Sequence, residues 1–149
     1  MWRWIVHIQK EVNPALNTVT AYGDDYIEIN KTRHTQSVYF TPEGQIHDLG
    51  IQSPTDFTTE LLQKITGLVP IKADAMAFLD NSPPSFDNPE QIEVVLIGTG
   101  AHQHFLPPQL TNLLLMARIG VEVMDSQAAA RTYNILMSEG RRVVAALII

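Results

Sequence analysis

The last third of the chain alternates short apolar runs with helical patterns. Each run is rich in β-branched residues and apolar at successive positions, which is typical of strands buried on both faces of a parallel sheet. The three runs are residues 92–97, 121–124 and 143–149. Strands joined through helices are almost always parallel, with right-handed crossovers. Residues 92–149 therefore predict a strand-helix-strand-helix-strand unit whose last strand is central.

The two helices of this unit have recognisable ends. Pro107 and Pro108 are predicted to open the first helix, and Gly120 to end it, because proline fits the first helical position and glycine the C-terminal cap. Asp125 or Ser126 is predicted to cap the second helix, which Gly140 ends. Both helices must then pack their apolar sides against the sheet.

The first half of the chain has the pattern of antiparallel strands. Residues 18–22 and 26–29 predict a hairpin around the turn Gly23-Asp24-Asp25. Residues 34–40 predict one further strand, followed by a turn at residues 41–44 and a return over residues 45–48. This antiparallel region is expected to extend or cover the parallel sheet.

A helix is predicted from the capping box at residues 53–56 to about Lys64, with its stop at Gly67. Residues 71–79 are ambiguous between strand and helix, and the three prolines of residues 80–89 predict a loop. Residues 1–17 have no clean period and are expected to form a loose arm. The predicted fold class is α/β: a three-layer single domain over residues 1–149, with a mixed sheet, a C-terminal parallel unit and an N-terminal antiparallel hairpin region.

Composition narrows the function classes. Sixteen acidic and ten basic residues give a net charge of -6, and no cluster of Lys and Arg suits a nucleic-acid backbone. The absence of cysteine excludes thiolate metal sites and cysteine nucleophiles. No apolar run is long enough for a membrane span, and the start lacks a secretion signal, so we expect a cytoplasmic protein without membrane insertion.

The loop Gly98-Thr99-Gly100 follows a buried strand at the sheet edge where α/β proteins tend to bind ligands. Glycines there allow a backbone to approach a pyrophosphate, but the third glycine of the dinucleotide fingerprint is replaced by Gln103. A sharp exit from the strand explains the same glycines. Both interpretations stay open, with the structural one preferred.

His102 and His104 lie two residues apart on the same loop. Two imidazoles can begin a metal site, but zinc or iron needs a third ligand, and none is close in sequence. We expect a solvated loop and no metal.

The helix after Asp125 contributes the other candidates. Ser126 lies at its start, where free amides suit a carboxylate or phosphate. Arg131 and Asn134 lie three residues apart on its polar side, an arrangement that allows both to grip such a group together. Capping explains Asp125, and an ion pair or solvated face explains Arg131. Because no nucleophile with a base and no acid-base pair of carboxylates is recognisable, catalytic residues are not assigned and an enzyme is not favoured.

Three segments together resemble a known family: residues 96–100, 124–134 and 139–143, with the sequences LIGTG, MDSQAAARTYN and EGRRV. The pattern is similar to the small Mth-domain family, which includes the third assembly factor of mitochondrial respiratory complex I and the adipogenesis-associated Mth-domain protein. The likeness is specific over residues 92–149 and weaker over residues 22–42. It implies a compact three-layer α/β fold, an accessory role in assembly of a respiratory complex, and no catalytic residues to carry over.

Two functions follow as hypotheses. The first is a non-catalytic binding or assembly-accessory protein whose partner is another protein, with no cofactor. The second is a domain that binds a small molecule or anion, with or without a reaction, at Gly98, Thr99, Gly100, His102, Ser126, Arg131 and Asn134. An exposed apolar patch favours the first hypothesis, and a deep pocket lined by the polar candidates favours the second.

Overall fold

A computed structural model describes residues 16–72, 79–81 and 85–149 of the chain. The strands are β1 (Val19–Tyr22), β2 (Ile27–Ile29), β3 (Thr32–His34), β4 (Val38–Phe40), β5 (His47–Asp48), β6 (Val69–Pro70), β7 (Phe86–Asp87), β8 (Val94–Gly98), β9 (Gly120–Met124) and β10 (Val143–Leu147). The helices are the 3₁₀ turn η1 (Pro54–Asp56), α2 (Thr59–Thr66), α4 (Pro108–Met116) and α5 (Ser126–Ser138).

The main sheet has five strands in the order β5-β4-β10-β8-β9. The pairs β10–β8 and β8–β9 are parallel, whereas β10–β4 and β4–β5 are antiparallel. All five residues of β8 and of β10 are buried. The predicted C-terminal parallel unit is therefore confirmed, with the last strand at the centre of the sheet, and the mixed α/β fold is confirmed with it.

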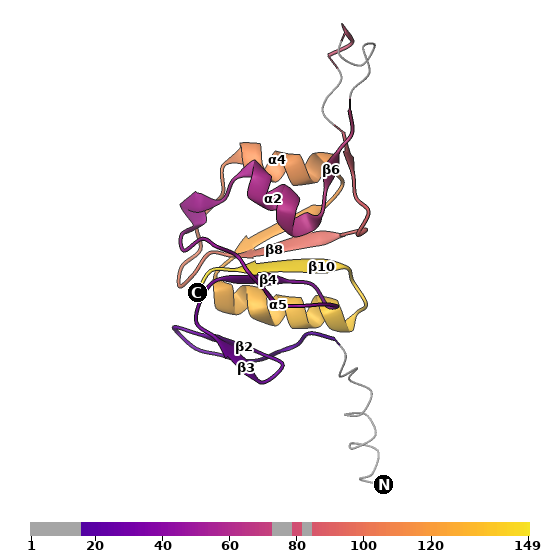
Figure 1. Cartoon of the computed structure of the whole chain (residues 1–149). Helices are drawn as coiled ribbons and strands as arrows, with labels where there is room; N and C mark the ends of the chain where they lie inside the picture. The colour runs from indigo at the N-terminus through magenta and orange to yellow at the C-terminus, as the bar shows by residue number, and fades with distance from the viewer. Residues whose placement is uncertain (1–15, 73–78, 82–84) are drawn as a thin grey trace.

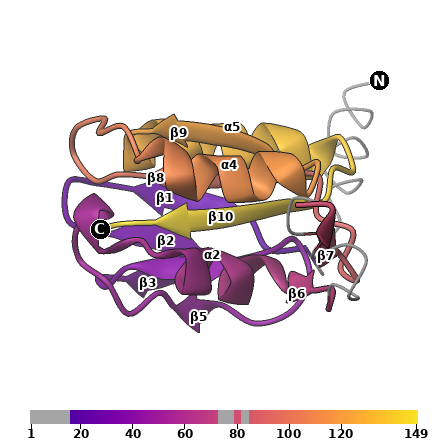
Figure 2. The same ribbon diagram turned by 90° about the horizontal axis from the view of Figure 1, so that it is seen from above.

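Helices cover both faces of this sheet (Figures 1 and 2). Helices α2 and α4 pack on one face, where their buried apolar residues share a core with Val95, Ile97 and Val144. Helix α5 packs on the other face, against Leu96, Ala145 and other residues of the second core. Because successive side chains of a strand point to opposite faces, the apolar runs of β8 and β10 supply both cores.

The predicted hairpin is also confirmed. Strands β1, β2 and β3 form a separate three-stranded antiparallel sheet, which lies against the side of α5 that faces away from the main sheet (Figure 1). Ile27 and Ile29 are buried in the core that α5 shares. Helix α5 is thus enclosed between two sheets.

Asn17 fastens this small sheet to the rest of the molecule. The sequence predicts a loose N-terminal arm here, but Asn17 is buried, and its Nδ2 donates to the carbonyls of Thr41 and Gly44. Its own carbonyl accepts from the hydroxyl of Tyr133 at 2.7 Å. The prediction of an arm is wrong at this residue, and residues 1–15 lie outside the described part of the chain.

The single strand predicted over residues 34–40 is wrong. The chain forms two strands there: β3 pairs with β2 in the small sheet, and β4 pairs with β10 in the main sheet. Residues 35–37 carry the chain from one sheet to the other. Residues 30–37 contain no apolar residue, so hydrophobic periodicity gives no signal of where one strand ends and the next begins.

The capping box at residues 53–56 does not begin the predicted long helix. The Ser53 side chain caps only the short turn η1, which ends at the extended residue Phe57. Helix α2 begins at Thr59 and is capped by Thr58, whose Oγ1 accepts from the amide of Leu61 at 3.1 Å. Its end at Gly67, in the left-handed conformation, agrees with the prediction.

The predicted end of α4 at Gly120 is wrong as well. The helix stops at Met116, Arg118 takes the left-handed backbone with φ 62°, and Gly120 is the first residue of β9. The loop predicted over residues 80–89 contains the short strand β7, which pairs with β6. Most of the ambiguous segment 71–79 lies outside the described residues.

Candidate functional site

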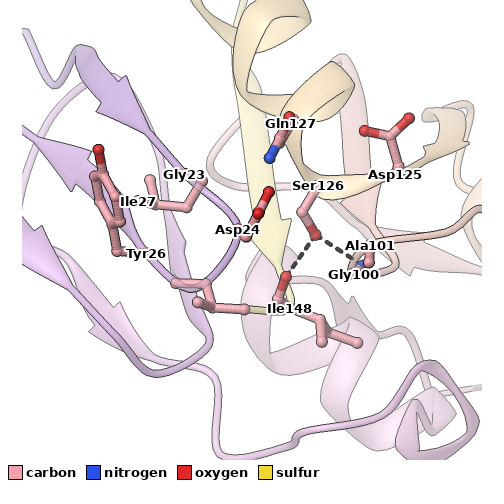
Figure 3. A pocket seen from close by; sticks show the side chains of 11 residues that line it. Gly23, Asp24, Tyr26, Ile27, Gly100, Ala101, Asp125, Ser126, Gln127 and Ile148 are labelled. Atoms are coloured by element: carbon pink, nitrogen blue, oxygen red, sulfur yellow. Dashed lines mark hydrogen bonds between the residues drawn. The ribbon is translucent and has the colours of Figure 1, made fainter.

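The loop of residues 98–100 meets the start of α5, as the parallel topology predicts. The amide of Thr99 donates to the carbonyl of Met124, and the amide of Ser126 donates to the carbonyl of Gly100, each at 2.9 Å. The hydroxyl of Ser126 accepts from the amide of Gly100 at 2.8 Å and donates to the carbonyl of Ile148 (Figure 3). Ser126 is buried, and its hydroxyl joins the segments that follow β8 and β10.

Close packing explains Gly98. A Cβ atom there would lie 2.8 Å from both Cα and Oγ of Ser126 and 2.9 Å from Cδ2 of Leu147. Gly100 instead has a φ of 98°, a conformation that favours glycine. Both glycines have structural reasons in this fold.

Thr99 organises the loop that holds the two histidines. Its hydroxyl donates to the carbonyl of His102 at 2.7 Å and accepts from the amide of His104 at 3.1 Å, while the Thr99 residue itself is buried. Both histidines are exposed. Within residues 16–72, 79–81 and 85–149, no three His, Asp or Glu side chains gather closely enough to hold a metal ion.

Asp125 caps α5, as its position predicts. Its Oδ1 accepts from the amide of Ala128 at 2.9 Å. A carboxylate at this place also interacts favourably with the positive end of the helix dipole. The same charge opposes an anion near the first turn of α5.

Arg131 and Asn134 connect α5 to the small sheet. Arg131 donates to the hydroxyl of Tyr22 at 2.8 Å, and this bond is the main cause that raises the pKa of Arg131 above its ordinary value. Asn134 accepts from the amide of Val19 at 2.9 Å and donates to its carbonyl at 2.8 Å. The Asn134 amide thus extends β1 as a strand neighbour would, which removes it from a shared grip on a ligand.

A cavity of about 240 Å³ opens beside this cluster (Figure 3). Gly100 and Ser126 line it together with Asp125 and Gln127 of the α5 start and with Asp24 of the hairpin turn. Thr99, His102, Arg131 and Asn134 do not line it. Two carboxylates and no Lys or Arg are among the lining residues, so the cavity favours a neutral or cationic group over an anion. The sequence did not predict that the hairpin turn lines this cavity, because no local pattern indicates such a long-range contact.

The opposite end of the sheet carries Arg141 and Arg142. Arg141 forms an ion pair with Glu93, with Nε to Oε2 at 2.8 Å, and Arg142 donates from Nε to the carbonyl of Glu90 at 2.9 Å. A bond from the amide of Arg142, followed by that from Arg141, holds the pKa of Glu93 below its ordinary value. These arginines fasten β10 to the segment that leads into β8.

A second surface lies over α4 and the loop before it. None of the nine residues of α4 is charged. Phe105 is 88% exposed and Leu115 is 55% exposed, and Met116 is exposed beside it. Sequence reasoning missed this surface, although one signal was present: Leu115 and Met116 fall outside the apolar stripe of a helix that contains no charge.

The comparisons with known proteins agree with the fold. A family model described as "Protein of unknown function (DUF498/DUF598)" matches residues 19–148. The solution structure of a Bordetella pertussis protein, described as a Mth938-like domain, is similar with a TM-score of 0.72 and 49% identity, covering 93% of this chain and 89% of that one.

Two curated relatives match a shorter segment of 58 residues, which is 39% of this chain. An uncharacterised protein of Rhodobacter capsulatus is 45% identical over 47% of its length, and the mouse NADH dehydrogenase [ubiquinone] 1 alpha subcomplex assembly factor 3 is 43% identical over 31% of its length. The matched segment thus spans less than half of either relative.

In the part of the chain that the structure describes, none of the helices has the length and apolar character needed to cross a membrane. The family resemblance inferred from the three sequence segments is confirmed. Since the family model covers most of its length, the chain belongs to the DUF498/DUF598 family, whose solved relatives include a Mth938-like domain.

Proposed function

We propose that this domain is a non-catalytic binding protein that serves as an accessory in the assembly of a protein complex. The observation that carries the proposal is the uncharged surface of α4 with Phe105, Leu115 and Met116 exposed. Large apolar side chains left exposed on an uncharged helix suit a protein interface, because the cores of such interfaces are depleted of charge. The likeness to a protein named as an assembly factor of the ubiquinone-linked NADH dehydrogenase supports the same role.

The polar candidates support this proposal indirectly. Ser126, Thr99 and Asn134 use their side chains in hydrogen bonds within the fold. A group whose donors and acceptors are already occupied has little left to offer a substrate. The partner of the domain is therefore expected to be another protein, and we place both in the cytoplasm as part of the proposal.

The test is affinity purification of the tagged chain from its own cells, followed by mass spectrometry. Leu115→Glu should reduce the recovered partner by about tenfold or more, because a charge at the centre of an apolar interface is desolvated without a counter-charge. Ile135→Glu is the matched control, since Ile135 is 58% exposed but lies on α5 at the other side of the sheet. Equal recovery with both variants would remove α4 from the interface, and fractionation of the same cells tests the location.

A second candidate function is binding of a small molecule at the cavity beside Gly100 and Ser126, which adjoins the site proposed from the sequence. The lining carboxylates of Asp24 and Asp125 favour a cationic or neutral ligand. An anionic ligand would instead need Arg131 to leave Tyr22. NMR titration with phosphate, acetate and putrescine distinguishes these ligands: shifts at Gly100 and Ser126 with putrescine alone support the cavity as a cation site, whereas phosphate shifts that vanish in Arg131→Ala support an anion site.

A further inference from the structure

Strand β9 is the outer strand of the main sheet, and within residues 16–72, 79–81 and 85–149 no strand pairs with the other side of its backbone. Its bonds to β8 begin with the amide of Gly120, which donates to the carbonyl of Glu93, and end with the carbonyl of Met124, which accepts from the amide of Thr99. In a parallel pair, alternate residues bond to the same neighbour. Gly120, Glu122 and Met124 therefore face β8, and Val121 and Val123 turn their N–H and C=O groups outward.

One of these outward groups is already occupied. The side-chain amide of Gln103 donates to the carbonyl of Val123 at 3.2 Å. The amide and carbonyl of Val121 and the amide of Val123 remain at the free edge. Such a row of groups is a template for another strand.

The charge at this edge indicates which kind of strand fits. Glu122 is exposed at the middle of β9, and the one ion pair among the described residues joins Arg141 and Glu93, so Glu122 has no cationic partner there. In an antiparallel pairing, the residue opposite Glu122 belongs to a pair without backbone hydrogen bonds, where side chains lie closest. An opposite charge at that position stabilises the pair, and a like charge destabilises it.

A second copy of this chain fits the edge poorly. The antiparallel register that engages Val121 and Val123 of both copies is centred on Glu122, so the two Glu122 carboxylates would face each other. Each copy also carries a net charge of -6. Electrostatics thus favour a different, basic occupant.

We propose that β9 binds an extended segment of another protein, antiparallel to it, with a Lys or Arg opposite Glu122. The inference rests on the proposed binding function and names the backbone edge and the charge by which the partner is recognised. Helix α4 packs against the same outer strand.

The experiment uses NMR titration of the full chain with a short peptide of alternating Val and Thr that carries a central Lys, and with a matched peptide that carries Glu. The Lys peptide should shift the amides of Val121 and Val123 and bind about threefold tighter than the Glu peptide. Glu122→Lys should reverse this preference. Shifts that avoid β9, or an unchanged preference in Glu122→Lys, would overturn the proposal.

A backbone variant tests the edge independently of charge. Val121→Pro removes the outward N–H without removing a bond to β8, and proline is tolerated on an edge strand when its missing N–H faces solvent. Peptide affinity should fall by up to about tenfold, whereas Val121→Thr, which keeps the N–H, should bind as the parent does. Parent-like binding by Val121→Pro contradicts the proposal, and if that variant does not fold, the reversal in Glu122→Lys decides alone.

Two further outcomes separate the alternatives. Self-association in sedimentation that Val121→Pro abolishes would mean that a second copy occupies the edge, which overturns the proposal. Partner recovery from cells that is lost in Leu115→Glu but kept in Val121→Pro would leave the binding function intact and reject the edge strand as its site.

Discussion

Two regions of the molecule differ in what their side chains do. At the carboxyl ends of the parallel strands they bond within the fold, whereas on the outer side of α4 and β9 they are exposed. Thr99 and Ser126 at the strand ends look like ligand-binding residues, as does Asn134 farther along α5, yet each bonds to backbone groups of a neighbouring segment. On the outer side, Phe105 and Leu115 belong to no motif, yet both are large apolar side chains that are exposed. Motif-like residues here hold the fold, whereas plain apolar residues are the ones left for a partner.

The physical reason lies in the topology. Helix α5 sits between two sheets, so its start and its inner face must satisfy the backbone groups of strand ends on both sides. Helix α4 has a sheet on one side only, so the side chains of its outer side are not needed to bond to backbone groups of strand ends.

Ala145→Asp should have the largest effect. Ala145 is fully buried at the middle of β10, paired with Phe40 on one side and Leu96 on the other. A carboxyl group there loses its hydration without a partner, which costs several kcal/mol against a total stability of about 5–15 kcal/mol. We expect no soluble protein on expression, while Ala101→Asp, in an exposed loop, should express normally. A variant at position 145 as heat-stable as the parent would be incompatible with a buried central strand.

Gly98→Ala should destabilise the protein by about 2–3 kcal/mol, because its Cβ meets the backbone of Ser126, which cannot move aside as a flexible side chain can. Gly120→Ala is the matched control on the neighbouring strand. A Cβ at Gly120 would find its nearest atom at 3.6 Å, so that change should be close to neutral. Urea unfolding measures both. Equal effects would mean that the strand end is no more tightly packed than the exposed start of β9.

Ser126→Ala should cost about 1–2 kcal/mol, since it leaves the partly buried amide of Gly100 and the buried carbonyl of Ile148 without their hydrogen-bond partner. Ser138→Ala, at the far end of the same helix, removes one exposed bond to the carbonyl of Ile135 and should cost much less. Thermal unfolding followed by circular dichroism compares them. If Ser126→Ala kept full stability but lost ligand binding, the strand end would be a binding site after all.

These contrasts define what the sequence could predict. The parallel unit was predictable because its apolar runs and capping residues are local signals, and Asp125 caps α5 as its position indicates. The crossing at residues 35–37 was not, because β3 pairs with the preceding strand β2, whereas the partner of β4 is β10, far later in the chain. The start of α2 was misplaced because Ser53 and Thr58 both have capping side chains, and only the extended Phe57 between them decides where the helix begins.

The candidate site was predictable in its location and not in its chemistry. Topology alone brings the 98–100 loop to Ser126, whereas the direction of Arg131 toward Tyr22 depends on where the small sheet packs. The hairpin turn that supplies Asp24 to the cavity is separated from α5 by about a hundred residues of sequence. No local pattern encodes such a contact, so the sign of the charge at the cavity could not be foreseen.

Glu93, at the amino-terminal edge of the parallel strands, should have the smallest effect. Glu93 accepts from the amide of Arg142 at 3.1 Å and from Nε of Arg141 at 2.8 Å, and these bonds lower its pKa from 4.5. A depressed pKa in the folded state contributes stability above the unfolded-state pKa, and this contribution is lost as pH falls through the folded-state value. Glu93→Gln should therefore lower stability near neutral pH by a small constant amount, and its difference from the parent should shrink below pH 4.5. Because Glu93 is exposed, solvent screens the pair and keeps the effect small.

Urea unfolding across an acid pH series measures this difference in stability. Arg141→Gln should reproduce only part of the pH dependence, since the stronger contribution of the Arg142 amide remains. A difference that grows on acidification would show that the contacts of Glu93 do not favour its charged form, and that this edge is not fastened as the opposite edge is.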